Sequence, residues 1–223
     1  GTPNPEDYDI EPATDVIRWS ITRTWTGVNS SNWFDANNWD PVGVPDNLSQ
    51  VIIADINSAS AFDCVVNNAA QNAVCKTLTI KSSSVADNYG GQLAVQTTLI
   101  VEGDITIEGT GLSKGLLSVT GTLEVKGNFT ESDVTDSTTE PRSGTTTFNG
   151  TGKQFITGTT RFGVITVAST LALEDSVTVT IESSFTVNAG ATLEMTRNAG
   201  SQNAPTLRFA NGASATINGS IKA

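Results

Sequence analysis

The densest group of side chains that could do chemistry lies in the stretch FDANNWDPVGVPDN, residues 34–47. It offers three carboxylates, Asp35, Asp40 and Asp46, among several asparagines. Oxygen ligands of this kind suit calcium. The same side chains also form Asx turns and caps, in which a side-chain oxygen accepts a hydrogen bond from a nearby backbone N–H. The EF-hand spacing is absent, so turns are the simpler interpretation and a calcium site is the alternative.

A second chemically rich stretch is TESDVTDSTTEPRSGTTT, which interrupts the strand pattern and predicts a loop insertion near residues 130–146. A similar excursion near 84–92 carries an aromatic ring that can stack on a sugar. We therefore predict ligand-binding loops here, with solvated linkers as the simpler alternative. The side chains that would serve such a site are Tyr89, Glu131, Asp133, Asp136, Glu140 and Arg142.

A β-helix polysaccharide lyase or hydrolase is the enzymatic alternative. A hydrolase needs acids clustered on one face of adjacent coils, and a lyase needs a lysine or arginine base beside calcium-binding acids. The candidates are scattered along the chain: Glu102, Asp104, Glu108, Glu124, Lys126, Arg142, Lys153 and Arg161. There is no histidine, which removes the commonest general base and most zinc sites. We expect no catalytic residue and no organic cofactor.

Charge and cysteine content narrow the classes of partner. The chain has 223 residues and a net charge of −11, which argues against nucleic acid and against an anionic membrane. No apolar run approaches the length of a membrane span. The two cysteines, Cys64 and Cys75, favour a local disulfide over buried free thiols, and a disulfide would imply an oxidising compartment.

The elements that must position these side chains are short alternating strands. Four stretches show two such strands separated by a glycine or asparagine: LIVEGDITIEG, LSVTGTLEVKG, FTVNAGATLEM and LRFANGASATING. Alternation places one parity inside and the other outside. Val101 and Val119 are 18 residues apart, and Val187 and Phe209 are 22 residues apart. A strand pair recurring at that interval predicts a solenoid with coils of 18 to 22 residues.

We therefore predict an all-β fold, a single-stranded parallel β-helix, with a β-sandwich as the alternative. A sandwich needs two-residue hairpin turns such as Asn-Gly. Here a single glycine lies inside a continuous alternation, which suits a corner because glycine tolerates positive φ. The T-x-T pairs in KTLTI and VTVTI also fit a flat threonine ladder that binds ice, although threonine is a favourable strand residue in any case.

A solenoid must cover its terminal coil, which otherwise exposes its interior and unpaired backbone groups. We predict an extended arm at 1–15, a tryptophan-rich capping segment at 16–55 and solenoid coils at 56–223. The large rings of the capping segment suit a lid: Trp19, Trp25, Trp33, Phe34 and Trp39. The far end carries no comparable lid, so we expect further coils or another domain to follow.

The stretch TWTG…NWFDANNWDPVGVPDN…VII resembles the module that begins β-solenoid segments in secreted, adhesin-like surface proteins of Bacteroidota. FDCVVNNAAQNAVCKTLTI resembles their paired-cysteine coil, and TTTFNGTGKQFITGTTRFGVITV resembles a recurring coil of the same proteins. The resemblance implies export, a right-handed β-helix and a surface or adhesive role, and it carries over no catalytic residue. We expect a secreted or cell-surface module that contacts carbohydrate or another surface, or serves as a stalk.

Overall fold

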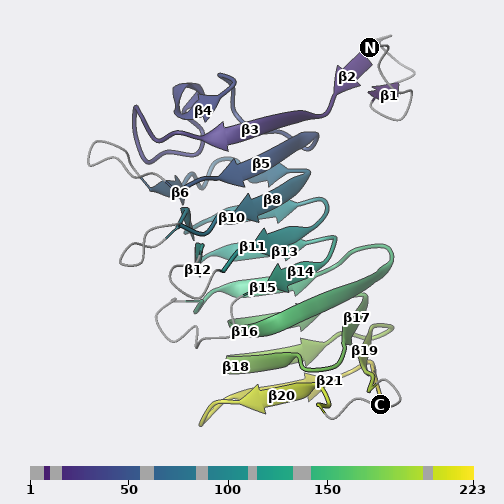
Figure 1. Cartoon of the computed structure of the whole chain (residues 1–223). Coiled ribbons are helices and arrows are strands. Elements are labelled where there is room, and N and C mark those ends of the chain that lie inside the picture. Colours follow the sequence, from purple (N-terminus) through teal and green to yellow (C-terminus); the bar gives the residue numbers. More distant parts are fainter. Residues whose placement is uncertain are drawn as a thin grey trace.

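The computed structural model describes residues 8–10, 17–55, 63–83, 90–109, 115–132, 142–197 and 203–223. These residues form an all-β parallel solenoid of about seven coils, stacked from β3 at one end to β20 at the other (Figure 1). The one helical element among them is a short 3-10 turn, η2 (Ala36–Asn38). No helix in the described ranges is long and apolar enough to cross a membrane.

An N-terminal segment precedes the coils. An antiparallel pair, β1 (Tyr8–Ile10) and β2 (Ile17–Trp19), comes first. β3 (Ile21–Trp25) then pairs antiparallel with β4 (Trp39–Asp40) and parallel with β5 (Ser49–Ile53). β5 in turn pairs parallel with a strand of the first coil, so the N-terminal segment continues the solenoid's own hydrogen bonding.

The strands of the seven coils follow in chain order. The first coil contains β6 (Cys64–Val66), β7 (Ala73–Cys75) and β8 (Thr77–Ile80), and the second contains β9 (Gln92–Val95), β10 (Thr98–Val101) and β11 (Ile105–Ile107). The third contains β12 (Leu116–Val119), β13 (Thr122–Val125) and β14 (Phe129–Glu131). The fourth to sixth share longer strands: β15 (Thr145–Phe148), β16 (Lys153–Val167), β17 (Thr170–Leu173), β18 (Thr178–Val187) and β19 (Thr192–Met195). The last contains β20 (Thr206–Phe209), β21 (Ser214–Ile217) and β22 (Ser220–Lys222).

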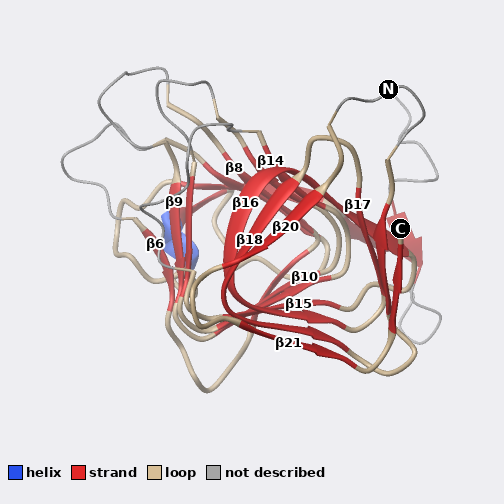
Figure 2. Ribbon diagram, turned by 90° about the horizontal axis from the view of Figure 1, so that it is seen from below, coloured by secondary structure: helices blue, strands red, loops and turns tan. Residues whose placement is uncertain are grey.

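Three faces enclose the interior (Figure 2). The opening face begins with β6, β9 and β12. The middle face contains β7, β10, β13, β15, residues 164–167 of β16, residues 184–187 of β18, and β21. The closing face contains β5, β8, β11, β14, the start of β16, β17, β19 and β22. All pairs within these faces are parallel, which confirms the predicted solenoid and shows that the sandwich alternative is wrong.

Alternation along each strand builds one continuous core. The strands of the first three coils bury alternate residues, and like residues stack: Ile53, Ile80 and Ile107 occupy successive positions of one inward column. Burying an isoleucine side chain stabilises a fold by about 1.5–3 kcal/mol. A single hydrophobic cluster therefore runs from Trp25 to Leu193.

The predicted interval of 18 to 22 residues is wrong for the stretches that suggested it. Val101 pairs with Val125 rather than with Val119, because β12 and β13 are successive faces of one coil. Contacts between neighbouring coils join residues 24 apart at Glu102 and Lys126 and 27 apart at Lys81 and Glu108. The corners vary in length, so no fixed period describes the chain.

Glycines at the corners serve two purposes. Gly190 and Gly212 adopt the predicted positive φ, +81° and +86°. At Gly121, however, φ is not in that region, and a Cβ would collide with the carbonyl oxygen of Thr97 in the coil above. There glycine is needed because the backbones of two coils touch.

The last coil differs from the others. Phe209, Ile217 and Ile221 continue the inward columns but remain 43%, 42% and 51% exposed. No described residue packs over them as the next coil does elsewhere, so this end of the core meets solvent.

Candidate functional site

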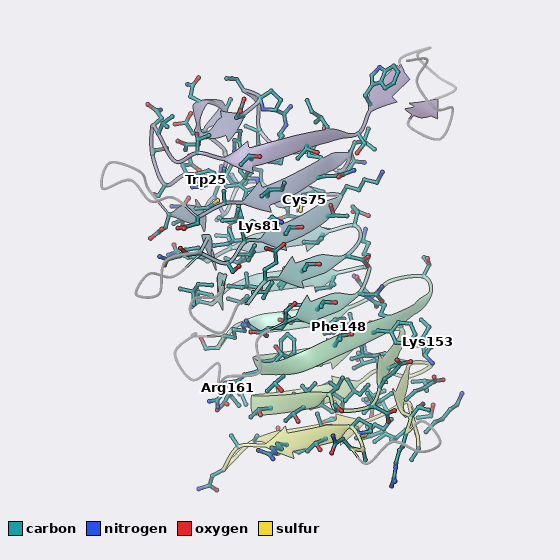
Figure 3. The ribbon with its side chains drawn as sticks, viewed as in Figure 1. Trp25, Cys75, Lys81, Phe148, Lys153 and Arg161 are labelled. Atoms are coloured by element: carbon teal, nitrogen blue, oxygen red, sulfur yellow. The ribbon has the colours of Figure 1, made fainter. Side chains whose placement is uncertain are left out.

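A tryptophan cluster (Trp25, Trp33, Trp39) lies near the N-terminal end of the stack, and Figure 3 labels Trp25 there. Trp39 packs edge-to-face against both others, with ring centroids 4.9 Å apart in each pair. Its Nε1–H donates to the carbonyl oxygen of Trp33 at 2.8 Å. Phe34 is half-buried against this core, whereas Trp19 is 49% exposed on β2. Trp19 is therefore not part of the cluster, although the predicted lid includes it.

Polar side chains hold the loop that carries the tryptophans. Asn38 is fully buried, and its Oδ1 accepts hydrogen bonds from the backbone N–H groups of Asn29 and Ser30, both at 2.9 Å. Asp35 accepts from Asn29 Nδ2 at 2.6 Å and from the backbone N–H of Asn37 at 3.1 Å. The hydrogen bond from Asn29, followed by that from Asn37, lowers the pKa of Asp35 below its ordinary value of 3.8.

The predicted calcium ligands use their oxygens within their own turns. Asp46 Oδ1 accepts from the backbone N–H of Leu48 at 3.1 Å and from Ser49 Oγ at 2.7 Å. Asp40 is exposed at the end of β4. Across the described ranges, no three acidic or cysteine side chains converge as metal ligands would. The turn interpretation accounts for Asp35 and Asp46, and calcium binding itself stays a prediction.

An open hollow of about 370 Å³ lies between this loop and the turn that leads into β7. Apolar surface comes from Phe34, Val44, Pro45 and Val74, and polar groups come from Asp46, Asn47, Gln71 and Asn72. Within the described residues, the amide side chains of Asn47, Gln71 and Asn72 make no hydrogen bond. Sequence reasoning missed Gln71 and Asn72, because only the fold brings that turn beside the tryptophan-rich loop.

Two predicted ligand residues, Glu131 and Arg142, form a buried ion pair instead. Their side chains are 1% and 2% exposed, and the guanidinium donates from Nη1 to Oε2 at 3.0 Å and from Nη2 to Oε1 at 3.2 Å. Arg142 also donates from Nε to the carbonyl oxygen of Leu117 at 3.1 Å and from Nη1 to Thr160 Oγ1 at 2.8 Å. The prediction of exposed ligand residues is therefore wrong for this pair.

The reason lies in the alternation of β14. Phe129 faces inward, and Glu131 has the same parity, so it takes the position that follows Ile107 in the inward column. A carboxylate placed there needs a charged partner and hydrogen bonds. Arg142 supplies both, with its guanidinium carbon 5.8 Å from the centre of the Phe129 ring. The pair thus fixes the two ends of the insertion inside the core.

The other predicted loop residues, Tyr89, Asp133, Asp136 and Glu140, lie outside the described residues. For the predicted insertions near 84–92 and 130–146, the structure accordingly describes only the residues at their two ends.

The predicted disulfide is not found: Cys64 and Cys75 are free and buried. They project inward from β6 on the opening face and β7 on the middle face, so each packs on its own side of the coil. Burial raises the pKa of both thiols, and the charges of Asp63 and Glu102 add to this effect at Cys64 and Cys75 respectively.

The charged residues weighed as catalytic candidates pair off between coils rather than cluster. Lys126 Nζ lies 2.8 Å from Glu102 Oε1, and Lys81 Nζ lies 2.6 Å from Glu108 Oε1. Arg161 and Lys153, both labelled in Figure 3, make corresponding pairs with Glu182 and Glu194. Hydrogen bonding from Lys153 lowers the pKa of Glu194 below its ordinary value of 4.5.

Glu108 and Glu124 do not form a carboxylate pair. Glu108 follows β11 on the closing face and bonds to Lys81, whereas Glu124 lies in β13 on the middle face, where its Oε2 accepts from Asn149 Nδ2 at 3.2 Å. The carboxylates of these pairs therefore each bond to a residue of another coil and do not converge on a shared site: Glu102, Glu108, Glu124, Glu182 and Glu194.

Residues 24–112 match the model of a domain of unknown function (DUF8693). That range contains the tryptophan cluster, both walls of the hollow and the first two coils. No curated protein matches the chain, and no solved structure matches it.

Proposed function

We propose that this chain is a non-catalytic, secreted or cell-surface β-solenoid module that binds carbohydrate through its N-terminal hollow while its coils serve as a rigid stalk. The hollow is the observation that carries the proposal, because it combines apolar surface with three amide side chains that have no internal hydrogen bond. Small-molecule sites have this composition, with a few polar groups that fix orientation.

The chemistry of the hollow favours an uncharged sugar. A sugar ring presents C–H groups on its faces and hydroxyls at its rim. Phe34 and Val74 can pack against the former, and the amides of Gln71 and Asn72 can exchange hydrogen bonds with the latter. With a net charge of −11, the chain disfavours an acidic polysaccharide.

The N-terminal segment supports the role of a display end. Trp33 N donates to the carbonyl oxygen of Val65 at 3.0 Å, and Val65 N donates to that of Ser31 at 2.7 Å, so the loop continues the ladder above β6. β5 covers β8 in the same way. We infer that this segment caps the first coil, in line with its resemblance to the opening module of Bacteroidota adhesin-like proteins.

A glycan array probed with the intact chain tests the proposal. We expect the protein to bind uncharged saccharides on the array and to release no shortened saccharide. The double variant Gln71→Ala, Asn72→Ala should bind roughly tenfold more weakly or worse, because each lost hydrogen bond contributes about 1 kcal/mol. Gln96→Ala, an exposed amide outside the hollow, is the matched control and should bind as the parent does.

Two outcomes contradict the proposal. Binding to none of the saccharides removes the carbohydrate role. Release of shortened products from a polysaccharide would instead establish the β-helix enzyme.

A further inference from the structure

The outward positions of the middle face form a regular array of hydroxyl side chains in the last four coils. Two columns run along this face, two residues apart on each strand. One column holds Thr145, Val164, Ser184 and Ser214, and the other holds Thr147, Thr166, Thr186 and Thr216. We call these eight residues the hydroxyl face; all but Val164 are serine or threonine.

The backbone register makes this array a lattice. The strands pair in register, so each column repeats at the strand spacing of about 4.8 Å, and the two columns lie about 6.6 Å apart. Figure 2 shows β15 and β21 along one flat side of the solenoid. A flexible ligand in solution does not require such a repeat, whereas the surface of a crystal does.

The interior fixes these positions. The alternating residues behind the hydroxyl face, among them Phe148, Ile165, Val167, Phe185 and Val187, are at most 1% exposed. β-Branched threonine side chains are stiff at χ1. On β15, β16 and β18 the hydroxyl and methyl groups of the face are therefore presented in an ordered arrangement before any partner arrives, whereas β21 lies on the last coil, where the inward Ile217 is 42% exposed.

The hydroxyl face carries no charge, although the chain has a net charge of −11. Other parts of the same coils carry charged side chains, including Lys153, Glu194 and Lys222 on the closing face, Arg161 in β16 and Glu182 in β18. An uncharged patch in such a chain fits an uncharged partner.

We propose that the hydroxyl face binds ice. An ice surface is uncharged, rigid and periodic, and its oxygen atoms can accept from and donate to an ordered row of hydroxyls while threonine methyls pack between them. An uncharged crystalline polysaccharide is the rival partner. It is disfavoured because none of the eight residues has an aromatic ring on which a sugar could stack. The inference is independent of the hollow and of the proposed carbohydrate binding.

Inhibition of ice recrystallisation by the intact chain tests this inference. We expect the parent to inhibit, and Thr166→Lys to need a concentration roughly tenfold higher or more, because a long charged side chain holds the flat face away from the ice. Ala94→Lys is the matched control: Ala94 is an outward, half-buried residue on β9 of the opening face, where it lies between Val65 and Ser118 and outside any threonine column. It should inhibit as the parent does.

A second variant guards against misfolding. Thr186→Val keeps the shape of the side chain and removes one hydroxyl, and it should weaken inhibition while thermal unfolding stays close to that of the parent. The inference is overturned if the parent does not inhibit recrystallisation or if Ala94→Lys weakens inhibition as much as Thr166→Lys. A different result would assign the face to polysaccharide instead. In that case the parent would bind microcrystalline cellulose, Thr166→Lys would not, and neither protein would inhibit ice recrystallisation.

Discussion

At the scale of single residues, the buried pair of Glu131 and Arg142 is a sensitive point of the core. Arg142→Ala leaves a carboxylate unpaired inside the solenoid, and we expect a loss of about 3–5 kcal/mol in the free energy of unfolding. The double variant Glu131→Leu, Arg142→Leu removes both charges and should recover most of that loss. Denaturant unfolding of the three proteins measures this, and equal losses in the single and double variants would contradict it.

The two cysteines predict a stability that depends on alkaline pH. Burial raises the thiol pKa in the folded chain above the ordinary value of 9.0, so the folded state holds these protons more tightly than the unfolded state. The stability that the two thiols contribute is complete below their pKa in the unfolded chain. It is lost as the pH rises from there toward their pKa in the folded chain. The denaturant midpoint should therefore be lower at about pH 10 than at neutral pH.

The control for this effect replaces both thiols by groups of similar size that do not titrate. The variant Cys64→Val, Cys75→Val should lose less stability between the two pH values than the parent loses. An identical decrease in both proteins would assign the effect to other groups.

At the scale of elements, the turn inside β16 depends on a glycine. Gly158 has φ +93°, and an added Cβ would collide with the carbonyl oxygen of Glu131 on the neighbouring strand. Gly158→Ala should therefore destabilise by more than about 1 kcal/mol, the ordinary cost of such backbone strain. Gly152→Ala is the matched control, because nothing lies within 4 Å of its added Cβ.

Thermal unfolding of the two glycine variants compares them directly. If Gly152→Ala and Gly158→Ala unfold at the same temperature, the close approach of β14 and β16 is not as tight as the structure has it.

Strand pairs could be predicted from the sequence because alternation is a local property. In LIVEGDITIEG the residues of one parity, Leu99, Val101, Ile105 and Ile107, are all buried in β10 and β11. The same rule could have placed Glu131 inside, since it shares the parity of Phe129. Its charge predicts an exposed loop position instead, so alternation and charge disagree at this residue, and alternation is correct.

The pairing of coils and the composition of the sites could not be predicted in this way. Which strand lies above Val101 depends on the length of the corners, which follows no period. The hollow joins Asn47 to Gln71 and Asn72 across two turns, and the hydroxyl face joins Thr147 to Thr216 across four coils. These neighbours follow from register, which only the folded chain defines.

At the scale of the whole molecule, each coil contacts mainly the next, so stability should vary along the stack. The last coil leaves Phe209, Ile217 and Ile221 partly in solvent, whereas the inward residues of β11 and β13 are at most 1% exposed. We expect backbone amides of β20, β21 and β22 to exchange hydrogen fastest and those of β11 and β13 slowest. Native-state hydrogen exchange measures this, and uniform protection along the chain would contradict it.

The direction of the backbone hydrogen bonds has a mechanical consequence. Strands run around the solenoid, so the bonds between coils point along its long axis, and the first and last coils lie at opposite ends (Figure 1). Tension applied between these ends acts on every interface between coils, and the last coil, whose inward residues are partly exposed, should separate first. The solenoid would then unfold one coil at a time from its end. Each unfolded coil would lengthen the chain and lower the force while the remaining coils stay folded.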